Sequence, residues 1–337
     1  MRTRSCLPMR CAALAVVALA TAAALPSAAA PPAPATFSIV AADSAAGEVG
    51  VAVASRFFAV GAVVPFAAAE VGAVATQAFA NVSFGARGLD LLERGLEPDE
   101  VLRVLLRDDA GRERRQVGVV DASGRSATDT GEGCNAWAGG RTGPGYAVQG
   151  NILTGEEVVA AMERSFLASA GQPLAERLYR ALAAGEAAGG DSRGKQSAAL
   201  RVARAGAGYG GYTDQAIDIR VDDHLEPVQE LGRLLDLAMV NDAWNRGWNA
   251  YVAGRYDEAL VWQERTAERA ERVPGMLPEV LYDLAVVRLA NEDRLGAMAA
   301  LERAVALNPR LAEQARGDPD LEALGDWRQR LGLPDAP

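Results

Sequence analysis

Thr36 directly follows the triplet Ala33-Pro34-Ala35, at the point where an Ala- and Pro-rich sequence changes to a β-forming sequence. Small residues at the outer positions of such a triplet are what a signal peptidase reads, so we expect cleavage after Ala35. The cut gives Thr36 a free α-amine, whose ordinary pKa of about 7.7–8.0 lets it take the hydroxyl proton near pH 7. Thr36 is therefore predicted to be a nucleophile that carries its own base. The alternative is that it only begins a β-strand.

Other reactive side chains are scarce, which favours this chemistry. The chain has one histidine, His224, and beyond residue 35 one cysteine, Cys134. Zinc sites built on several histidines are excluded, as is a disulfide within the mature chain. A nucleophilic Cys134, or a cation site at Asp222, Asp223 and His224, is kept as a third interpretation, against a partly buried thiol and a solvated loop. We expect neither a metal nor a cofactor.

The first 35 residues have the three parts of a secretory signal. Arg2, Arg4 and Arg10 precede the apolar run 12–25, which is shorter than the roughly 20 residues that span a bilayer. We therefore expect an exported protein, periplasmic or secreted, without a membrane anchor. Removing these three arginines from the 34 basic side chains leaves 31 against 44 acidic ones, a formal charge of −13. Such a surface repels nucleic acid and anionic lipid, so neither is an expected partner.

Beyond the leader, hydrophobic periodicity predicts an α+β domain over residues 36–238. Strands are expected at 36–42, 48–55, 71–78, 115–121, 126–130, 197–203 and 215–222, and helices at 85–94, 98–107, 155–170 and 173–186. The Gly-rich passage 139–150 carries no predicted strand, and the glycines at 206–211 are expected to form a hairpin turn. Strands, then helices, then strands, then helix is the order of a layered α+β fold rather than of alternating βαβ units.

The sequence becomes helical past Pro227, and a repeat appears. Residues 247–259 align with residues 285–297, and the second unit continues into Leu301, Ala304 and Pro309, as in a tetratricopeptide repeat. We predict a small all-α, tetratricopeptide-like domain over 241–331, with two repeats at 241–310 and a capping helix near 319–331. Two such repeats alone have only marginal stability, so we expect them to pack against the first domain.

The opening segment TFSIVAADSAAGEVGVAVASRFF resembles the start of the domain of unknown function 1028 family, which is grouped with the N-terminal-nucleophile (Ntn) hydrolases. Later blocks agree with that family: RRQVGVVDASG, WAGGRTGPGYAVQGNIL, GGDSRGKQSAAL, and YGGY followed by DIRVDDH. The resemblance covers about residues 36–238. The helical tail is similar to C-terminal extensions on some relatives.

This resemblance implies an αββα sandwich, with two stacked sheets between helical layers. By similarity to Ntn hydrolases at large, the reaction would be amide hydrolysis through an acyl-enzyme on Thr36. Candidate helpers are Ser55 and Arg56 beside the N-terminus, the amides of Gln77, Asn81 and Asn151 as oxyanion donors, the ion pair Asp191–Arg193, and the donors Gln196 and Ser197. The alternative for each helper is a turn or strand-end residue satisfied by the backbone.

Two functions of different classes follow. The first is an exported Ntn-type hydrolase acting on a small-molecule or peptide-like amide. The second is a non-catalytic binding or scaffold protein that recognises a protein partner through the helical repeats, because a fold alone does not establish activity.

Overall fold

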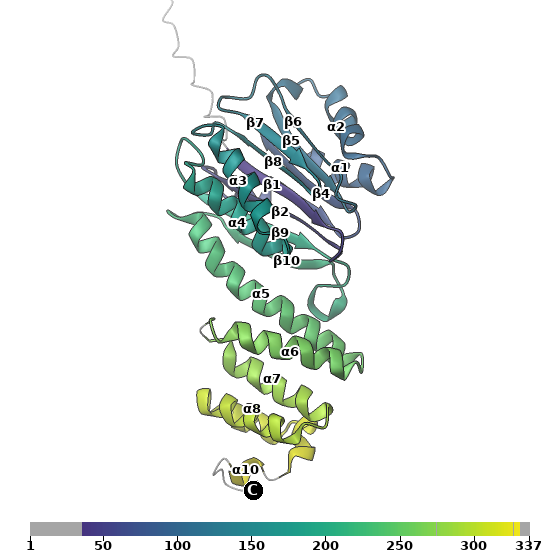
Figure 1. Ribbon diagram of the computed structural model, residues 1–337, viewed down its shortest axis with the longest axis vertical. Coiled ribbons are helices and arrows are strands. Elements are labelled where there is room, and N and C mark those ends of the chain that lie inside the picture. The colour runs from purple at the N-terminus through teal and green to yellow at the C-terminus, as the bar shows by residue number, and fades with distance from the viewer. Residues whose placement is uncertain (1–35, 274, 326, 331–337) are drawn as a thin grey trace, which may run out of the picture. The chain divides into compact units, whose positions relative to one another are not determined.

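The structure, a computed structural model, describes residues 36–273, 275–325 and 327–330 (Figure 1). The predicted leader, residues 1–35, lies outside that range. The described chain contains two antiparallel sheets, of six and four strands. The larger sheet has the order β10-β9-β2-β1-β8-β7, with β1 at Thr36–Asp43, β2 at Glu48–Ser55, β7 at Gly139–Gly143, β8 at Tyr146–Asn151, β9 at Ser197–Ala203 and β10 at Gln215–Val221. The smaller has the order β3-β4-β5-β6, with β3 at Pro65–Ala68, β4 at Gly72–Ala78, β5 at Arg115–Asp121 and β6 at Ser126–Thr130.

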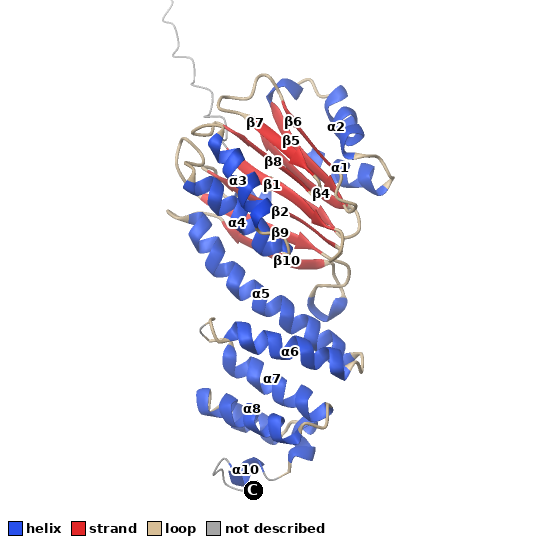
Figure 2. Cartoon of the chain, viewed as in Figure 1, coloured by secondary structure: helices blue, strands red, loops and turns tan. Residues whose placement is uncertain are grey.

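The two sheets lie face to face, and helices cover the outer face of each (Figure 2). Helices α1 (Ser83–Glu93) and α2 (Pro98–Arg107) pack on the smaller sheet, while α3 (Glu157–Ala168) and α4 (Leu174–Ala187) pack on the larger. This part of the chain therefore has four layers, and the predicted mixed α+β class is confirmed.

Alternation along β1 decides which layer each side chain faces. Phe37 and Ile39 lie in the core shared with α3 and α4. Val40 lies in a second core, between the two sheets. Thr36 and Ser38 have the parity of Val40, so their side chains also point between the sheets.

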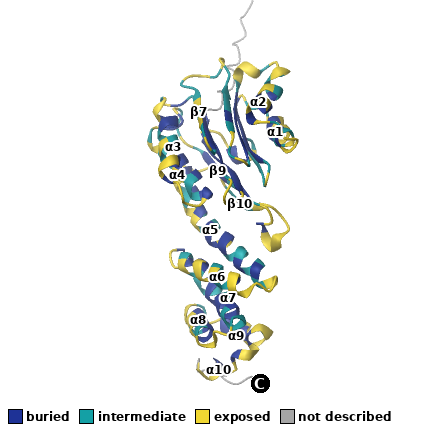
Figure 3. Cartoon of the chain, turned by 45° about the vertical axis from the view of Figure 1, so that its right-hand side comes forward, coloured by how far each residue is buried: buried dark blue, intermediate teal, exposed yellow. Residues whose placement is uncertain are grey.

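Side chains alternate in the same way on the neighbouring strands. As a result, several polar side chains point into the layer between the two sheets. The central part of this layer is enclosed, since strands β1, β2, β4, β5, β8 and β9 are buried along most of their length (Figure 3). Besides Thr36 and Ser38, the buried polar side chains that face it are Ser55, Gln77, Gln116, Gln149, Asn151 and Ser197. A buried polar atom is costly unless it is hydrogen-bonded, so these side chains must find partners among one another and in the adjacent backbone.

The Gly-rich passage at 139–150 is a correction to the predicted elements, because it forms β7 and β8. Its glycines are needed for close packing: a Cβ on Gly140 would lie 2.8 Å from Thr128 Cγ2, and one on Gly139 would lie 2.7 Å from the Trp137 ring. The four-residue strand β3 was also not predicted, since a run of that length carries little periodicity. Elsewhere the predicted strands and helices agree with the structure to within about two residues.

Past the sheets the chain is helical. Helix α5 (Pro227–Val252) packs on β9, β10 and α4, and is followed by α6 (Tyr256–Ala270), α7 (Leu277–Ala290) and α8 (Arg294–Leu307), each in contact with its neighbour in sequence. The repeat-matched Gly247, Ala259, Ala285 and Ala297 are all buried. The segment predicted as a capping helix contains the 3-10 turn Pro319–Leu324 and the short helix α10 (Trp327–Arg330), preceded by α9 (Leu311–Arg316).

Of the described helices, none combines the length and the apolar character needed to cross a membrane.

Candidate functional site

Thr36 is the first residue of β1 and lies in the middle of the larger sheet. It pairs with Ser55 of β2 on one side and with Asn151 of β8 on the other. Its hydroxyl donates a hydrogen bond to Ser55 Oγ at 3.1 Å, and the residue is 2% exposed. The predicted nucleophile and the predicted neighbour Ser55 are thus brought together.

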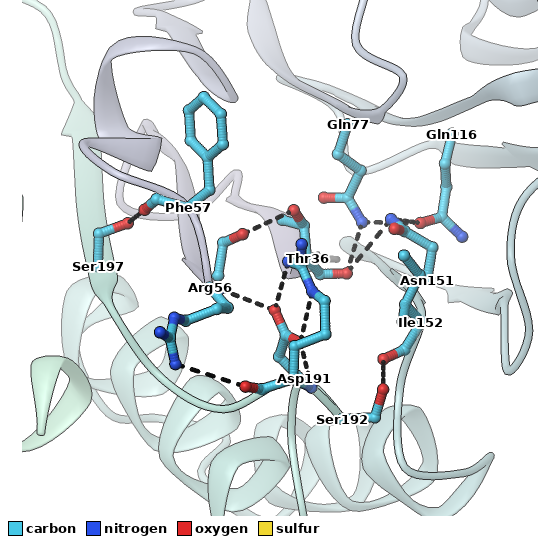
Figure 4. Close-up of polar contacts among 12 residues, drawn as sticks. Thr36, Arg56, Phe57, Gln77, Gln116, Asn151, Ile152, Asp191, Ser192 and Ser197 are labelled. Carbon is cyan, nitrogen blue, oxygen red and sulfur yellow. Dashed lines mark hydrogen bonds and ion pairs between the residues drawn. The ribbon is translucent and has the colours of Figure 1, made fainter. Parts of the chain in front are cut away.

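The main-chain carbonyl of Thr36 is held by two side-chain amides (Figure 4). Gln77 Nε2 donates to this oxygen at 3.3 Å and Asn151 Nδ2 at 3.5 Å. The same two nitrogens also donate to Gln116 Oε1, at 2.8 and 2.9 Å. Gln77 and Asn151, predicted as oxyanion donors, therefore contact the backbone of the nucleophile.

Gln116 was not predicted from the sequence as a site residue, yet it determines the orientation of the side-chain amides of Gln77 and Asn151. It is fully buried, and its own Nε2 donates to Thr130 Oγ1 and to the carbonyls of Gly150 and Gly139, at 2.8, 2.8 and 3.2 Å. With its nitrogen committed to these acceptors, its oxygen must face Gln77 and Asn151. Its sequence signal is weak, because RQVGVVD is a strand buried on both faces, where alternation does not separate inside from outside.

The network continues one step deeper along β1. Ser38 Oγ donates to Gln77 Oε1 at 2.5 Å, and Gln149 Nε2 donates to Ser38 Oγ at 2.7 Å. Gln149 occupies the space that a side chain at Gly118 would fill, since a Cβ there would lie 2.2 Å from Gln149 Oε1. The larger and smaller sheets are thus joined by hydrogen bonds behind Thr36 as well as by apolar packing.

A buried carboxylate lies at the same strand end. Asp191, 6% exposed, accepts hydrogen bonds from Arg56 N at 2.7 Å and from Arg193 N at 2.9 Å, and its Oδ2 lies 2.9 Å from Arg193 Nη2. Figure 4 shows this carboxylate directed toward Thr36. The expected ion pair is present, while its orienting role stays a prediction.

Three other predicted helpers are engaged elsewhere. Asn81 donates to Asp109 at 3.1 Å and accepts from Ser83 at the start of α1. Gln196 donates to Asp223 at 3.1 Å. Ser197 pairs with Ser55 in the sheet, but its hydroxyl binds the 57–60 turn, through the carbonyl of residue 57 and the N–H of residue 60.

Backbone strain is found next to the two amides that hold Thr36. Ala78, directly after Gln77, has φ +64°, and Ile152, directly after Asn151, has φ +51°. For a β-branched residue such as Ile152 the left-handed region is an outlier. Strained residues of this kind cluster at functional sites, where the surrounding structure holds them in place.

The residues of the third interpretation show no catalytic arrangement. Burial raises the pKa of the Cys134 thiol, which disfavours the reactive thiolate, and Sγ lies 3.3 Å from the Arg115 carbonyl. His224 Nδ1 accepts from the N–H of Glu226 at 3.0 Å. Within the described ranges, no three His, Cys, Asp or Glu side chains are grouped to hold a metal ion.

A large groove lies away from Thr36. It has a volume of about 1190 Å³, is lined by α4, α5 and α6, and reaches the β1–β2 turn at Asp43 and Glu48, the opposite end of β1 from Thr36. Trp262 lies in its wall, with the guanidinium carbons of Arg246 and Arg265 over the ring at 4.8 and 5.1 Å. This groove and the Thr36 region are separate features of the molecule.

Comparison with known proteins identifies a family and a similar structure. The model of the family of unknown function DUF1028 matches residues 36–231. A crystal structure of a Silicibacter pomeroyi protein described as belonging to that family superposes with a TM-score of 0.55 at 29% identity, over 60% of this chain and 89% of that one. No functionally curated protein gives a significant match.

Proposed function

We propose that the chain, which belongs to the DUF1028 family, is an exported Ntn-type hydrolase that cleaves an amide with Thr36 as its nucleophile. The observation that carries the proposal is the position of Thr36. It begins the central strand, its hydroxyl is bonded to Ser55, and its carbonyl is fixed by two buried amides. The four layers of sheets and helices support the αββα Ntn-like assignment, and the helix pairs α5–α6 and α7–α8 support a tetratricopeptide-like tail.

The chemistry begins with cleavage before Thr36, which frees its α-amine. The amine takes the hydroxyl proton while Oγ1 attacks the carbonyl carbon of the substrate amide. The C–N bond then breaks, the leaving amine receives that proton, and an ester on Thr36 remains. Water attacks this ester with the amine again as base, which releases the acid and restores Thr36.

The surrounding groups have different parts in this scheme. Gln77 and Asn151, oriented by Gln116, hold the main chain of Thr36 so that Oγ1 stays at a fixed angle to the substrate. Ser55 positions the hydroxyl. The Asp191 carboxylate, anchored by Arg56 N and by Arg193, would stabilise the protonated amine that forms after each proton transfer.

The test is covalent labelling of the mature protein. Intact mass and N-terminal sequencing should show a chain that begins at Thr36, and a β-lactone should then add its mass to the Thr36 peptide. Thr36→Ser should still be labelled, Thr36→Ala should not, and Thr213→Ala, on an exposed turn, should behave as the natural chain. A different mature N-terminus, or labelling that survives Thr36→Ala, contradicts the proposal.

A second candidate, a non-catalytic binding protein, is favoured by the separate groove along α4, α5 and α6. In this case the fold is a scaffold, and Trp262 with its flanking arginines would contribute to recognition. It requires that a folded chain starting at Thr36 be inert to the β-lactone. Labelling of Thr36 therefore decides between the two.

A further inference from the structure

Among the described residues, one cation near the end of β2, the strand end that pairs with Thr36, has no acidic partner. Arg56 follows Ser55, and its main-chain N–H, not its side chain, is bonded to Asp191. The guanidinium is exposed, with Nη1 3.5 Å from the Arg193 carbonyl, and no carboxylate of the described residues forms an ion pair with it.

The neighbouring cations of the 191–195 segment are different. Arg193 is paired with Asp191, and Lys195 is paired with both Glu186 and Glu226. Arg56 is thus the cation at this strand end whose charge no neighbouring acid offsets within the described chain. In a protein with a formal charge of −10, such a position attracts an anion locally.

Aromatic side chains are exposed on the two loops that leave this strand end. Phe57 and Phe58 follow Arg56 and are 39% and 63% exposed. Phe79, 50% exposed, comes two residues after Gln77, with the Arg114 guanidinium 4.6 Å from its ring centre. Single exposed apolar residues are ordinary. Here three phenylalanines lie on the loops that follow Ser55 and Gln77, which both contact Thr36, and we take them to indicate a surface for an apolar group.

We propose that the substrate is an amide that carries a free carboxylate and an apolar group, as an N-acyl amino acid does. Arg56 binds the carboxylate, because its planar fork matches both carboxylate oxygens. Phe57, Phe58 and Phe79 receive the apolar group. This inference rests on the proposed function of Thr36, and it makes Arg56 the residue that selects among substrates.

The test uses two β-lactones that share a phenyl group, one with a free carboxylate and one with its methyl ester. In each case Oγ1 attacks the lactone carbonyl, the ring C–O bond breaks, and the hydroxyl proton passes through the α-amine to the released alkoxide. The adduct therefore has the full mass of the probe. The measured quantity is the ratio of labelling rates of Thr36, acid over ester.

The natural chain should label at least about tenfold faster with the acid, as expected for a charge-assisted pair, and the ratio should fall toward one in 1 M salt. Arg56→Gln should bring the ratio near one, and Arg56→Lys should give an intermediate value, since it keeps the charge without the fork. Arg94→Gln, which removes an exposed arginine of α1, controls for net charge and should leave the ratio unchanged.

The apolar part is tested with an acid probe that has methyl in place of phenyl. The phenyl-to-methyl rate ratio should exceed one in the natural chain and fall in Phe58→Ser.

Failures of the two proposals are distinguishable. If Thr36 is labelled but the acid-to-ester ratio is near one in the natural chain, or is the same in Arg56→Gln, the substrate inference is wrong and the hydrolase proposal stands. If neither probe labels Thr36 in the natural chain, the hydrolase proposal fails and the substrate inference falls with it.

Discussion

At the scale of single residues, three described side chains hold Thr36: Ser55 contacts its hydroxyl, and the amides of Gln77 and Asn151 contact its carbonyl. The orientation of those two amides depends on Gln116, which accepts from both and donates to three acceptors of its own. A network in which every donor faces an acceptor has a single low-energy arrangement, and removal of its central member leaves several buried groups unpaired.

We therefore predict that Gln116→Leu lowers the free energy of unfolding by about 3 kcal/mol, since amide donors of Gln77 and Asn151 and the carbonyls of Gly139 and Gly150 lose a partner. Urea unfolding of the mature chain measures this. Gln172→Leu, an exposed position, should change it by less than about 0.5 kcal/mol. A Gln116→Leu chain as stable as the Gln172 control would show that the network does not stabilise the site.

At the scale of elements, glycine decides how closely α1 approaches the smaller sheet. A Cβ built on Gly85 would lie 2.1 Å from the Phe66 ring, so the helix and β3 could not keep their present distance. Alanine normally stabilises a helix relative to glycine by about 1 kcal/mol, but here the overlap outweighs that gain.

Gly85→Ala is expected to lower the free energy of unfolding by about 2 kcal/mol. Gly155→Ala is the matched control, because nothing lies within 4 Å of its Cβ position, and it should be nearly neutral. Thermal unfolding of both variants gives the comparison. Equal stability of the two would mean that Phe66 moves aside at little cost.

Elements were predictable from sequence where the chain is apolar and periodic. The strand Glu48–Ser55 has its predicted bounds because EVGVAVAS is rich in Val and bounded by a turn. Strand β7 was not predicted because GGRTG has no β-branched run, and because Gly140 is required by its packing against Thr128, a residue of β6 in the other sheet. Tertiary contacts of that kind leave no periodic signal.

The candidate site was predictable in the same limited way. Thr36, Ser55 and Gln77 could be found at or near the ends of predicted strands, where a polar residue is conspicuous, whereas Asn151 was found only as an amide directly after the Gly-rich passage. Gln116 could not, because its role depends on the pairing of the two sheets.

At the scale of the whole molecule, two buried carboxylates and two partly buried arginines connect the larger sheet to the helical tail. Glu48 at the start of β2 and Asp242 of α5 each contact both Arg204, which follows β9, and Arg246 of α5, at 2.6 to 2.9 Å. Burial raises the pKa values of Glu48 and Asp242, although the charge of Arg204 lowers them. At pH values just above the ordinary carboxyl pKa, the folded state therefore binds more protons than the unfolded chain. As a result, the contribution of this cluster to the free energy of unfolding decreases as the pH rises from the ordinary pKa to the raised one.

Arg204→Met should destabilise the protein by about 3 kcal/mol at pH 7, because it leaves two buried carboxylates with one arginine between them. The loss should be smaller at pH 5, where the carboxyls, with pKa values raised further by the substitution, take up protons. Urea unfolding at both pH values measures the difference. Arg233→Met, from an exposed pair with Glu230, should have little effect at either pH. A loss for Arg204→Met that does not depend on pH would contradict this account.

The position of β1 in the middle of its sheet also bears on the order of events as the protein matures. Thr36 is enclosed by Ser55 and by Asn151, and Ser55 is in turn paired with Ser197, so the sheet cannot close before β9 has emerged and found its place. Pairings between segments so distant in the sequence form slowly. A peptidase needs an extended, accessible chain, and in the closed sheet Thr36 is 2% exposed. If Thr36 is the proposed nucleophile, the bond before it must therefore be cut before the sheet closes. Slow folding leaves time for this cut, and we expect a faster-folding variant to keep more of its chains uncleaved.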